Sequence, residues 1–181
     1  MTDDELYRAY LAGDRTAGDT LMLRYADALT AYLAGFLPSI EDAEDLMFDC
    51  FAVILVDKPR IKEDHFRAYL FRVARNKANR LWKRRLNRKE FSLDEELPAQ
   101  EDSPEDTVLA GERSGILRRC LNRIAPQYRE ALWLIYDLEL SYAQAAEVLN
   151  CGTKKVEDLL RNGKKRLRQE LEKEGVTRAD I

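Results

Sequence analysis

The sequence is poor in the residues on which most enzymes and metal sites depend. It has one histidine and three cysteines, Cys50, Cys120 and Cys151, which are too far apart to form a CxxC pair. Neither a zinc site nor a disulfide framework is therefore indicated, and the three thiols are expected to be buried or half-buried. No glycine-rich phosphate loop, HExxH motif or GxSxG motif occurs. We therefore expect no enzymatic activity, no metal and no other cofactor.

Long apolar segments and helix-breaking residues are also scarce. No apolar run approaches the roughly 20 residues that span a bilayer, and the first residues, MTDDELYRAY, are acidic where a signal peptide is basic and then apolar. The 181 residues include 8 glycines and 5 prolines, and 45% are apolar and 35% charged. This composition predicts a soluble, helix-rich protein without membrane insertion, located in the cytoplasm.

Charge is strongly segregated along the chain, although the net charge is only −3. Residues 1–59 contain twelve acidic and four basic side chains, residues 60–89 contain two acidic and twelve basic ones, and residues 90–112 contain nine acidic and no basic ones. Segregated charge creates local potentials that the net charge conceals. The basic segment is therefore compatible with a nucleic-acid partner despite the acidic total.

Apolar residues recur at helical spacing through the first part of the chain. The first helix should bury Leu6, Tyr10 and Leu11. Two further helices follow, and Pro38 and Pro59 prevent their continuation. The apolar stripes of these helices are expected to form a core.

The third of these helices, over residues 41–56, concentrates acidic residues near its start. The helix macrodipole favours acids in a first turn, but this effect fades after one turn and explains Asp45 and Asp49 less well. The alternative is an acidic face, with Leu46 on it, that docks onto a basic partner surface. The candidate docking residues are Asp42, Asp45, Leu46 and Asp49.

A long basic helix is expected from His65 to about Arg88, with Asp64 as its N-cap. Its apolar residues, Trp82 among them, keep the helical period, and the positions between them are nearly all basic or amide. Like charges this dense repel one another and need a counter-charge, which nucleic-acid phosphate provides. A merely solvated face is the alternative. The candidate DNA-binding residues are Arg72, Arg75, Asn76, Arg80, Lys83 and Arg84.

The segment from Ala125 to Leu171 has the order of a helix-turn-helix with a supporting helix in front. Ser141 opens a short helix, Asn150 can close it in the left-handed conformation, and Gly152 or Thr153 can cap the helix that follows. A helical bundle with a solvated face is the alternative interpretation.

The last helix of this segment has one apolar stripe and one polar face. The stripe consists of Val156, Leu160, Gly163, Leu167 and Leu171. The polar face suits a helix whose first turns meet a major groove and whose tail meets phosphates. The candidate DNA-binding residues are Thr153, Lys154, Lys155, Glu157, Arg161 and Lys165.

These motifs resemble the bacterial RNA polymerase sigma factors of the extracytoplasmic-function (ECF) group. Residues 126–132 and 140–156 are similar to region 4, residues 42–51 to region 2.2, and residues 66–78 to regions 2.3 and 2.4. Two features depart from the family pattern. Phe48 stands where the family usually has glutamine, and Glu157 and Asp158 stand where it commonly has basic or small polar residues.

The resemblance implies an all-α chain of two small helical domains, a region 2 bundle over residues 1–89 and a region 4 helix-turn-helix over residues 114–175, joined by an acidic linker over residues 90–113. It implies that region 2 docks on the clamp helices of the largest subunit of core RNA polymerase and recognises and melts the minus-ten element, with Asn76 as a candidate for a base-edge contact. Region 4 would recognise the minus-thirty-five element. Core RNA polymerase, promoter DNA and an anti-sigma factor are the implied partners.

A second interpretation is a stand-alone DNA-binding repressor, or an interaction module, built on the same helix-turn-helix. It would bind duplex DNA without polymerase. Glu157 and Asp158 keep this interpretation open, because acids that face phosphates weaken binding. Glu157 can equally accept a hydrogen bond from a cytosine amino group and so change specificity.

Overall fold

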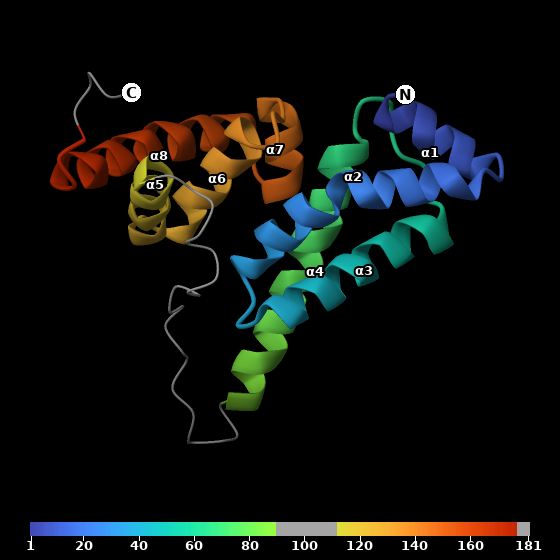
Figure 1. The fold of residues 1–181 in the computed structure, drawn as a ribbon, viewed down its shortest axis with the longest axis horizontal. Coiled ribbons are helices and arrows are strands. Elements are labelled where there is room, and N and C mark those ends of the chain that lie inside the picture. Colours follow the sequence, from blue (N-terminus) through green and yellow to red (C-terminus); the bar gives the residue numbers. More distant parts are fainter. Residues whose placement is uncertain (90–111, 177–181) are drawn as a thin grey trace. The chain divides into compact units, whose positions relative to one another are not determined.

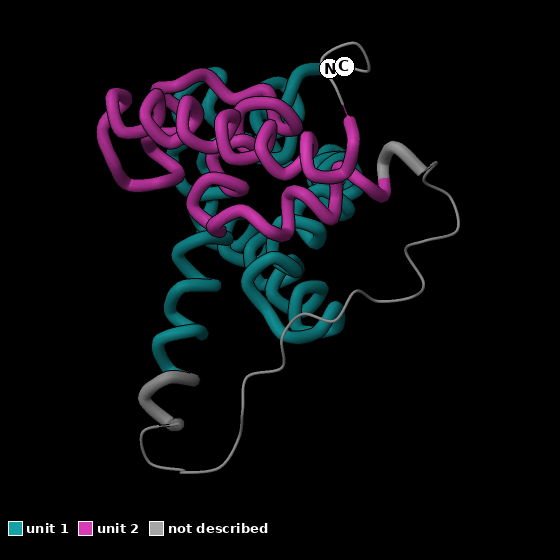
Figure 2. Tube along the Cα trace, turned by 90° about the vertical axis from the view of Figure 1, so that its left-hand side faces the viewer, with its two compact units in different colours: residues 1–100 teal, residues 101–181 magenta. Residues whose placement is uncertain are grey.

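The computed structural model describes residues 1–89 and 112–176. The chain divides into two compact units, Met1–Gln100 and Glu101–Ile181 (Figure 2). Every regular element of the described residues is a helix, which confirms the all-α fold class (Figure 1). None of the helices in these two ranges is both long enough and apolar enough to cross a membrane. The predicted acidic linker lies almost wholly outside the described residues.

Local capping signals begin the helices of the first unit. This unit contains α1 (Asp3–Leu11), α2 (Arg15–Ala34), α3 (Ile40–Asp57) and α4 (Phe66–Lys89). Thr2 and Glu5 form a capping box at α1, in which each side chain accepts from the other residue's backbone N–H. Gly13 turns the chain at φ 109°, a conformation that favours glycine. Asp14 and Ser39 then cap α2 and α3 with their side-chain oxygens.

The segment between α3 and α4 is bounded by two left-handed residues, Lys58 at φ 47° and Asp64 at φ 57°. Because α4 begins at Phe66, the residue before the helix is His65. The prediction that Asp64 is the N-cap is therefore wrong. Its backbone N–H instead donates to the Asp4 carboxylate at 2.6 Å, which ties this segment to α1.

The core of the first unit forms where α2, α3 and α4 pack on one another. Its large, fully buried side chains include Leu21, Leu29 and Leu33 from α2, Phe51 and Ile54 from α3, and Phe66, Leu70 and Phe71 from α4. From α1, Leu6 is buried as predicted, and Tyr7 is buried as well. The expected burial of Leu11 is wrong, since it is 42% exposed. Trp82, which keeps the apolar period of α4, is also 42% exposed.

Gly18 lets α1 and α2 approach closely, so Gly18→Ala is expected to destabilise the first unit. A β-carbon here would lie 2.7 Å from Cδ2 of Tyr10. The Tyr10 hydroxyl donates to the Leu55 carbonyl at 2.7 Å, so the ring cannot move away without straining that bond. We expect the free energy of unfolding, measured by urea denaturation, to fall by about 1–3 kcal/mol.

Gly115→Ala is the control for this substitution. Gly115 also lies in a helix, but the nearest atom to an added β-carbon is 3.7 Å away, in a flexible arginine side chain. Stability should stay equal or rise slightly, because alanine reduces the conformational freedom of the unfolded chain. An unchanged urea midpoint for Gly18→Ala would show that the α1–α2 contact is looser than the structure indicates.

The second unit contains the predicted short helix after Ser141 with both of its predicted ends, and the helix that follows it begins after Gly152, one of the two predicted caps. It contains α5 (Glu112–Arg123), α6 (Pro126–Tyr136), α7 (Tyr142–Leu149) and α8 (Thr153–Lys173). Ser141 and Gln144 form a capping box at α7. Asn150 closes α7 at φ 52°, and Gly152 is the N-cap of α8. The predicted helix-turn-helix is therefore present.

Helix α8 is the central helix of the second unit, because it packs against α5, α6 and α7. Val156 and Leu160 of the predicted stripe are 0% and 3% exposed, and Gly163 is also buried where α6 approaches. Leu167, further along the stripe, is half-buried. Leu159, which the predicted stripe omitted, is buried too, so the apolar face of α8 is broader than the spacing suggested.

Candidate functional site

The outward face of α8 is exposed along its first half. All six residues predicted to lie on it are exposed: Thr153, Lys154, Lys155, Glu157, Arg161 and Lys165. Gly152 leaves the start of the helix open, since an added β-carbon there would meet nothing within 4 Å. The arrangement gives a basic helix face with one unobstructed end, as a helix that enters a major groove requires.

An ion pair within α8 fixes the direction of one of these cations. Arg161 donates from Nη2 to Oδ1 of Asp158 at 2.5 Å. Asp158 lies one turn before Arg161, so the guanidinium is held along the helix axis. Glu157, exposed beside this pair, is the one acid among the six residues predicted on this face of α8.

Two exposed tyrosines beside the outward face of α8, Tyr136 and Tyr142, were missed by the sequence analysis. Lys164 places Nζ 5.0 Å from the centre of the Tyr136 ring. A hydrogen bond to Tyr136 raises the pKa of Lys164, so the lysine is positively charged at neutral pH. Tyr136 and Tyr142 are 55% and 43% exposed. Their only sequence signal is that two tyrosines fall outside the buried period of α6 and α7.

The basic face of α4 is exposed on the side away from the core. Asn76, Arg80, Lys83 and Arg84 are exposed, and Arg72 and Arg75 are half-buried. Arg72 lies over the Tyr69 ring, with Cζ 5.0 Å from its centre. Lys77 is 3.8 Å from Asp49 of α3, so this cation is partly neutralised within the unit. The six predicted residues therefore share one helix and leave several positive charges accessible.

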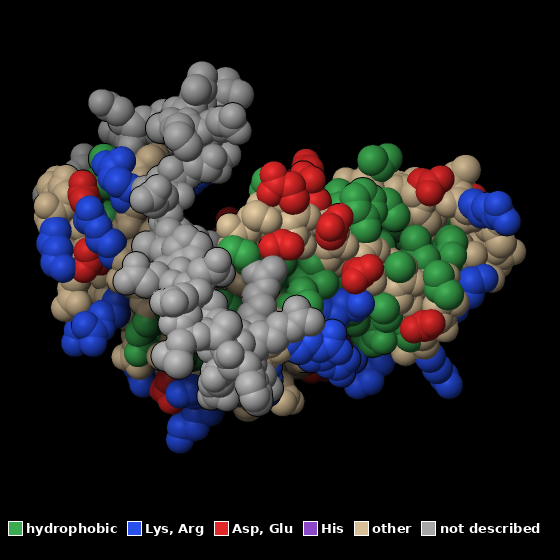
Figure 3. Space-filling view, turned by 90° about the horizontal axis from the view of Figure 1, so that it is seen from below, with side chains coloured by type: hydrophobic (Ala, Val, Ile, Leu, Met, Phe, Trp, Pro, Cys, Tyr) green, Lys and Arg blue, Asp and Glu red, His purple; other side chains and the backbone are tan. Residues whose placement is uncertain are grey.

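Helix α3 has an exposed acidic face, but the residues on this face differ from those predicted. Asp45 and Asp49 are exposed and Asp42 is half-buried. Leu46 is only 5% exposed, so the prediction that it lies on this face is wrong: it belongs to the core. Phe48 is 56% exposed instead. Acidic and hydrophobic side chains lie next to one another on the surface of the first unit (Figure 3).

The largest pKa shifts belong to buried structural groups. Burial raises the pKa of Tyr7 and of the Cys50 thiol to about 12. Burial and the hydrogen bond to Asp3 raise the pKa of Tyr25 to about 12. These groups stay protonated at neutral pH. The Tyr7 hydroxyl donates to the Pro59 carbonyl and the Tyr25 hydroxyl to the Asp3 carboxylate.

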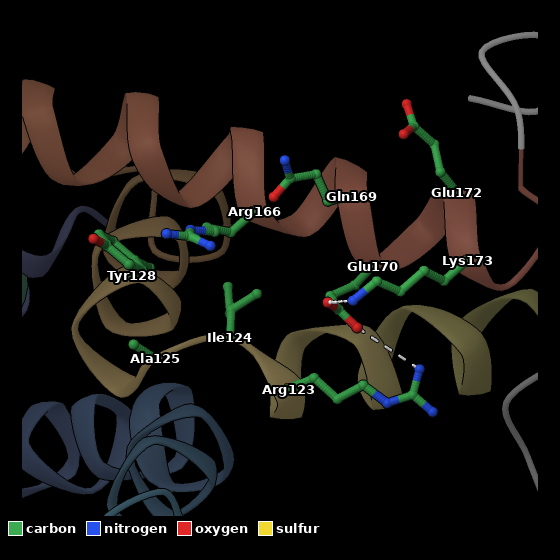
Figure 4. Close-up of a pocket in the computed structure, with 9 residues that line it drawn as sticks. All are labelled: Arg123, Ile124, Ala125, Tyr128, Arg166, Gln169, Glu170, Glu172 and Lys173. Atoms are coloured by element: carbon green, nitrogen blue, oxygen red, sulfur yellow. Dashed lines mark hydrogen bonds and ion pairs between the residues drawn. The ribbon is translucent and has the colours of Figure 1, made fainter.

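A hollow of about 700 Å³ lies between the start of α6 and the C-terminal part of α8 (Figure 4). It is lined by Arg123, Ile124, Ala125, Tyr128, Arg166, Gln169, Glu170, Glu172 and Lys173. Glu170 is paired with Lys173 at 2.5 Å, and Arg123 donates to Glu174 at 2.6 Å. The first pair lies within α8, whereas Arg123, the last residue of α5, connects α5 to the end of α8 through Glu174 and through Glu170 at 3.9 Å. In the two described ranges, no group of three His, Cys, Asp or Glu residues could hold a metal ion.

Two family descriptions match this sequence, and together they cover more than half of it. Sigma-70 region 2 matches residues 21–88, and sigma-70 region 4 matches residues 114–167. The first match contains the acidic face of α3 and the basic face of α4. The second contains the helix-turn-helix and the outward face of α8.

Curated relatives are sigma factors of one group. The ECF RNA polymerase sigma factor SigW of Bacillus subtilis (strain 168) is 25% identical over 173 residues, which are 88% of this chain and 91% of the relative. The ECF RNA polymerase sigma factor BldN of Streptomyces coelicolor is 30% identical over 149 residues, which are 80% of this chain and 56% of the relative.

Solved structures share the fold. The sigma factor RpoE of Bartonella quintana, in complex with the anti-sigma factor NepR, has a TM-score of 0.72 at 21% identity and covers 85% of this chain and 96% of its own. CnrH, in complex with the cytosolic domain of CnrY, has a TM-score of 0.64 at 24% identity and covers 94% and 97%. The chain therefore belongs to the ECF group of bacterial RNA polymerase sigma factors, the DNA-binding proteins that direct promoter-specific initiation of transcription.

Proposed function

We propose that this chain binds core RNA polymerase and recognises both the minus-ten and the minus-thirty-five elements of its promoters. One observation carries the proposal: a single chain has two exposed basic helix faces, on α4 and α8, each within the matched sigma-70 region. Basic faces on two separate units suit two separate stretches of DNA, since each neutralises its own run of phosphates.

In the first unit, the acidic face of α3 docks on the polymerase, and α4 recognises and opens the minus-ten element. Asp42, Asp45 and Asp49 meet basic side chains of the clamp helices of the largest subunit, and exposed Phe48 adds apolar area. The segment before α4 and the helix itself hold an unstacked base of the opened strand. Asn76 is the candidate for a base-edge contact, while the surrounding arginines hold phosphates.

In the second unit, α8 is the recognition helix for the minus-thirty-five element. Its first turn, with Thr153, Lys154 and Lys155, approaches the base edges, and Lys165 meets the backbone further on. Arg161, held by Asp158, is preset to donate in one direction. We also propose that an anti-sigma factor covers these surfaces, since the structurally similar sigma factor RpoE is bound to the anti-sigma factor NepR.

Co-purification of the full chain with bacterial core RNA polymerase tests the proposal first. Promoter fragments are then selected with the complex, and permanganate is used to modify unpaired thymines. We expect stable association and reactive thymines near the minus-ten position. Absence of association, together with tight binding of duplex DNA by the full chain alone, would instead support a stand-alone DNA-binding regulator.

Glu157→Lys shows whether α8 reads bases. Glu157 is exposed on the DNA-facing side of α8 and can accept from a cytosine amino group. We expect binding-site selection with the polymerase complex to show a changed base preference at one minus-thirty-five position, worth about 1–3 kcal/mol. Glu157→Gln, which removes the charge and keeps an acceptor oxygen, is the control. If Glu157→Lys changes only the salt dependence of binding, Glu157 faces solvent and reads no base.

A further inference from the structure

Helix α1 forms two hydrogen bonds to the segment between α3 and α4, on the side of the segment that faces the first unit. The Tyr7 hydroxyl donates to the Pro59 carbonyl at 2.7 Å. The Asp64 backbone N–H donates to Oδ2 of Asp4 at 2.6 Å. The partners of the first bond are 52 positions apart in the sequence, and those of the second are 60 positions apart. One bond lies near each end of the segment.

The backbone of this segment needs such support. Lys58 and Asp64, at its two ends, are non-glycine residues in the left-handed region. This conformation is sparsely populated and persists where surrounding contacts impose it. Contacts with α1 lie beside both residues: Lys58 is over the Tyr10 ring, 5.4 Å from its centre, and Asp64 is bonded to Asp4.

Helix α1 is itself fixed to the rest of the first unit. Asp3 pairs with Arg24 of α2 at 2.5 Å and also accepts from the Tyr25 hydroxyl. Arg67, in the first turn of α4, donates to that same Tyr25 oxygen at 3.0 Å. One partly buried network therefore connects the start of α1 to the start of α4.

The opposite side of the segment is open. Arg60 and Lys62 are exposed, and Ile61 between them is half-buried. Both cations lie between the two bonds to α1, directly before the helix that carries the basic face. The segment thus has an inner side bonded to α1 and an exposed outer side that carries Arg60 and Lys62 together with the acids Glu63 and Asp64.

From these contacts, we infer that α1 is a positioning element for promoter opening, and that Tyr7 and Asp4 fix the segment of residues 58–65 in the shape that receives an unstacked promoter base. The inference rests on the proposed function, in which this segment and α4 capture the opened minus-ten strand. Unstacking a base is costly, and a receiving segment that is already ordered loses less conformational freedom when the base arrives. Tyr7 and Asp4 need not touch DNA for this effect.

The test compares Tyr7→Phe and Asp4→Ala in the complete polymerase complex. Two DNA probes are used: a forked promoter fragment with an unpaired minus-ten strand, and a fully paired fragment that carries the minus-thirty-five element. We expect each variant to lower affinity for the fork about fivefold, the factor that one intramolecular hydrogen bond is worth. Affinity for the paired fragment should not change. Permanganate reactivity of minus-ten thymines should fall with the affinity for the fork.

Tyr10→Phe is the matched control. It removes the same hydroxyl from the same helix, but that hydroxyl donates to Leu55 within α3 and not to the segment. Asp4→Asn keeps an acceptor oxygen for the Asp64 N–H, so it should restore binding of the fork. Thermal unfolding of each variant reports any general loss of stability.

Three outcomes would overturn the inference. Equal fork affinities for Tyr7→Phe, Asp4→Ala and the unmodified chain would show that α1 has no role in capture. Equal losses in Tyr7→Phe and Tyr10→Phe, on both DNA probes, would show a general structural role. If the unmodified chain yields no reactive thymines, the proposed function fails and the inference fails with it.

Discussion

Replacing Phe51 with alanine is expected to unfold the first unit under conditions in which the second unit stays folded. Phe51 is 0% exposed in the core formed by α2, α3 and α4. Removing a buried phenyl ring forfeits its transfer free energy and leaves a cavity, a loss of about 3–5 kcal/mol. A domain's whole stability is only about 5–15 kcal/mol, so this loss is a large share of the total.

Two buried thiols allow each unit to be monitored in the same sample. Cys50 lies next to Phe51 in the first unit, Cys120 lies in the second, and both are 0% exposed. Burial raises the pKa of both thiols, so neither reacts readily in the folded state. Alkylation then follows the fraction of molecules in which the unit is open. For Phe51→Ala we expect the Cys50 rate to rise on the order of 100-fold or more, with the Cys120 rate unchanged.

Phe48→Ala is the matched control for this substitution. Phe48 precedes Phe51 by one turn of α3 but is 56% exposed. A surface substitution of this kind typically changes stability by less than about 0.5 kcal/mol. The Cys50 alkylation rate should therefore stay close to that of the unmodified chain. Equal acceleration by both substitutions would contradict the assignment of Phe51 to the core and Phe48 to the surface.

Both ends of α7 and the start of α8 could be predicted because their signals are local. Ser141 with Gln144, Asn150 and Gly152 act through hydrogen bonds or backbone conformations that involve only neighbouring residues. The six outward residues of α8 followed from helical spacing for the same reason. The orientation of Arg161 toward Asp158 did not, because a side-chain pairing depends on rotamers that spacing leaves open.

The errors concern residues whose burial depends on a distant partner. Leu46 and Phe48 both border the acidic face by spacing, and packing against the core decides that only Leu46 is buried. Tyr7 is buried because the segment after α3 and the ring of Phe66 meet it. Trp82 keeps the apolar period of α4, but Figure 1 shows that the last turns of α4 extend beyond α2 and α3.

The second large effect is expected from Asp45→Lys, which should lower affinity for core RNA polymerase by at least about thirtyfold. Asp45 is exposed on α3, past the first turn, so the helix macrodipole contributes little at this position. Removing one partner of an interfacial charge pair costs roughly 2–5 kcal/mol, and a lysine adds repulsion from the basic clamp helices. Fluorescence anisotropy of the labelled chain against core polymerase measures the change.

Asp27→Lys makes the same change of charge on α2, where Asp27 is exposed. It should leave polymerase affinity nearly unchanged, because long-range effects of a single exposed charge are screened within about 8 Å at physiological salt. The Cys50 alkylation rate of Asp45→Lys should also stay low, which separates lost docking from lost folding. If both lysine variants weaken association equally, the effect is one of net charge and α3 is not the docking face. If only Asp45→Lys does so, the acids of α3 form the contact surface, with the core residue Leu46 supporting them from beneath.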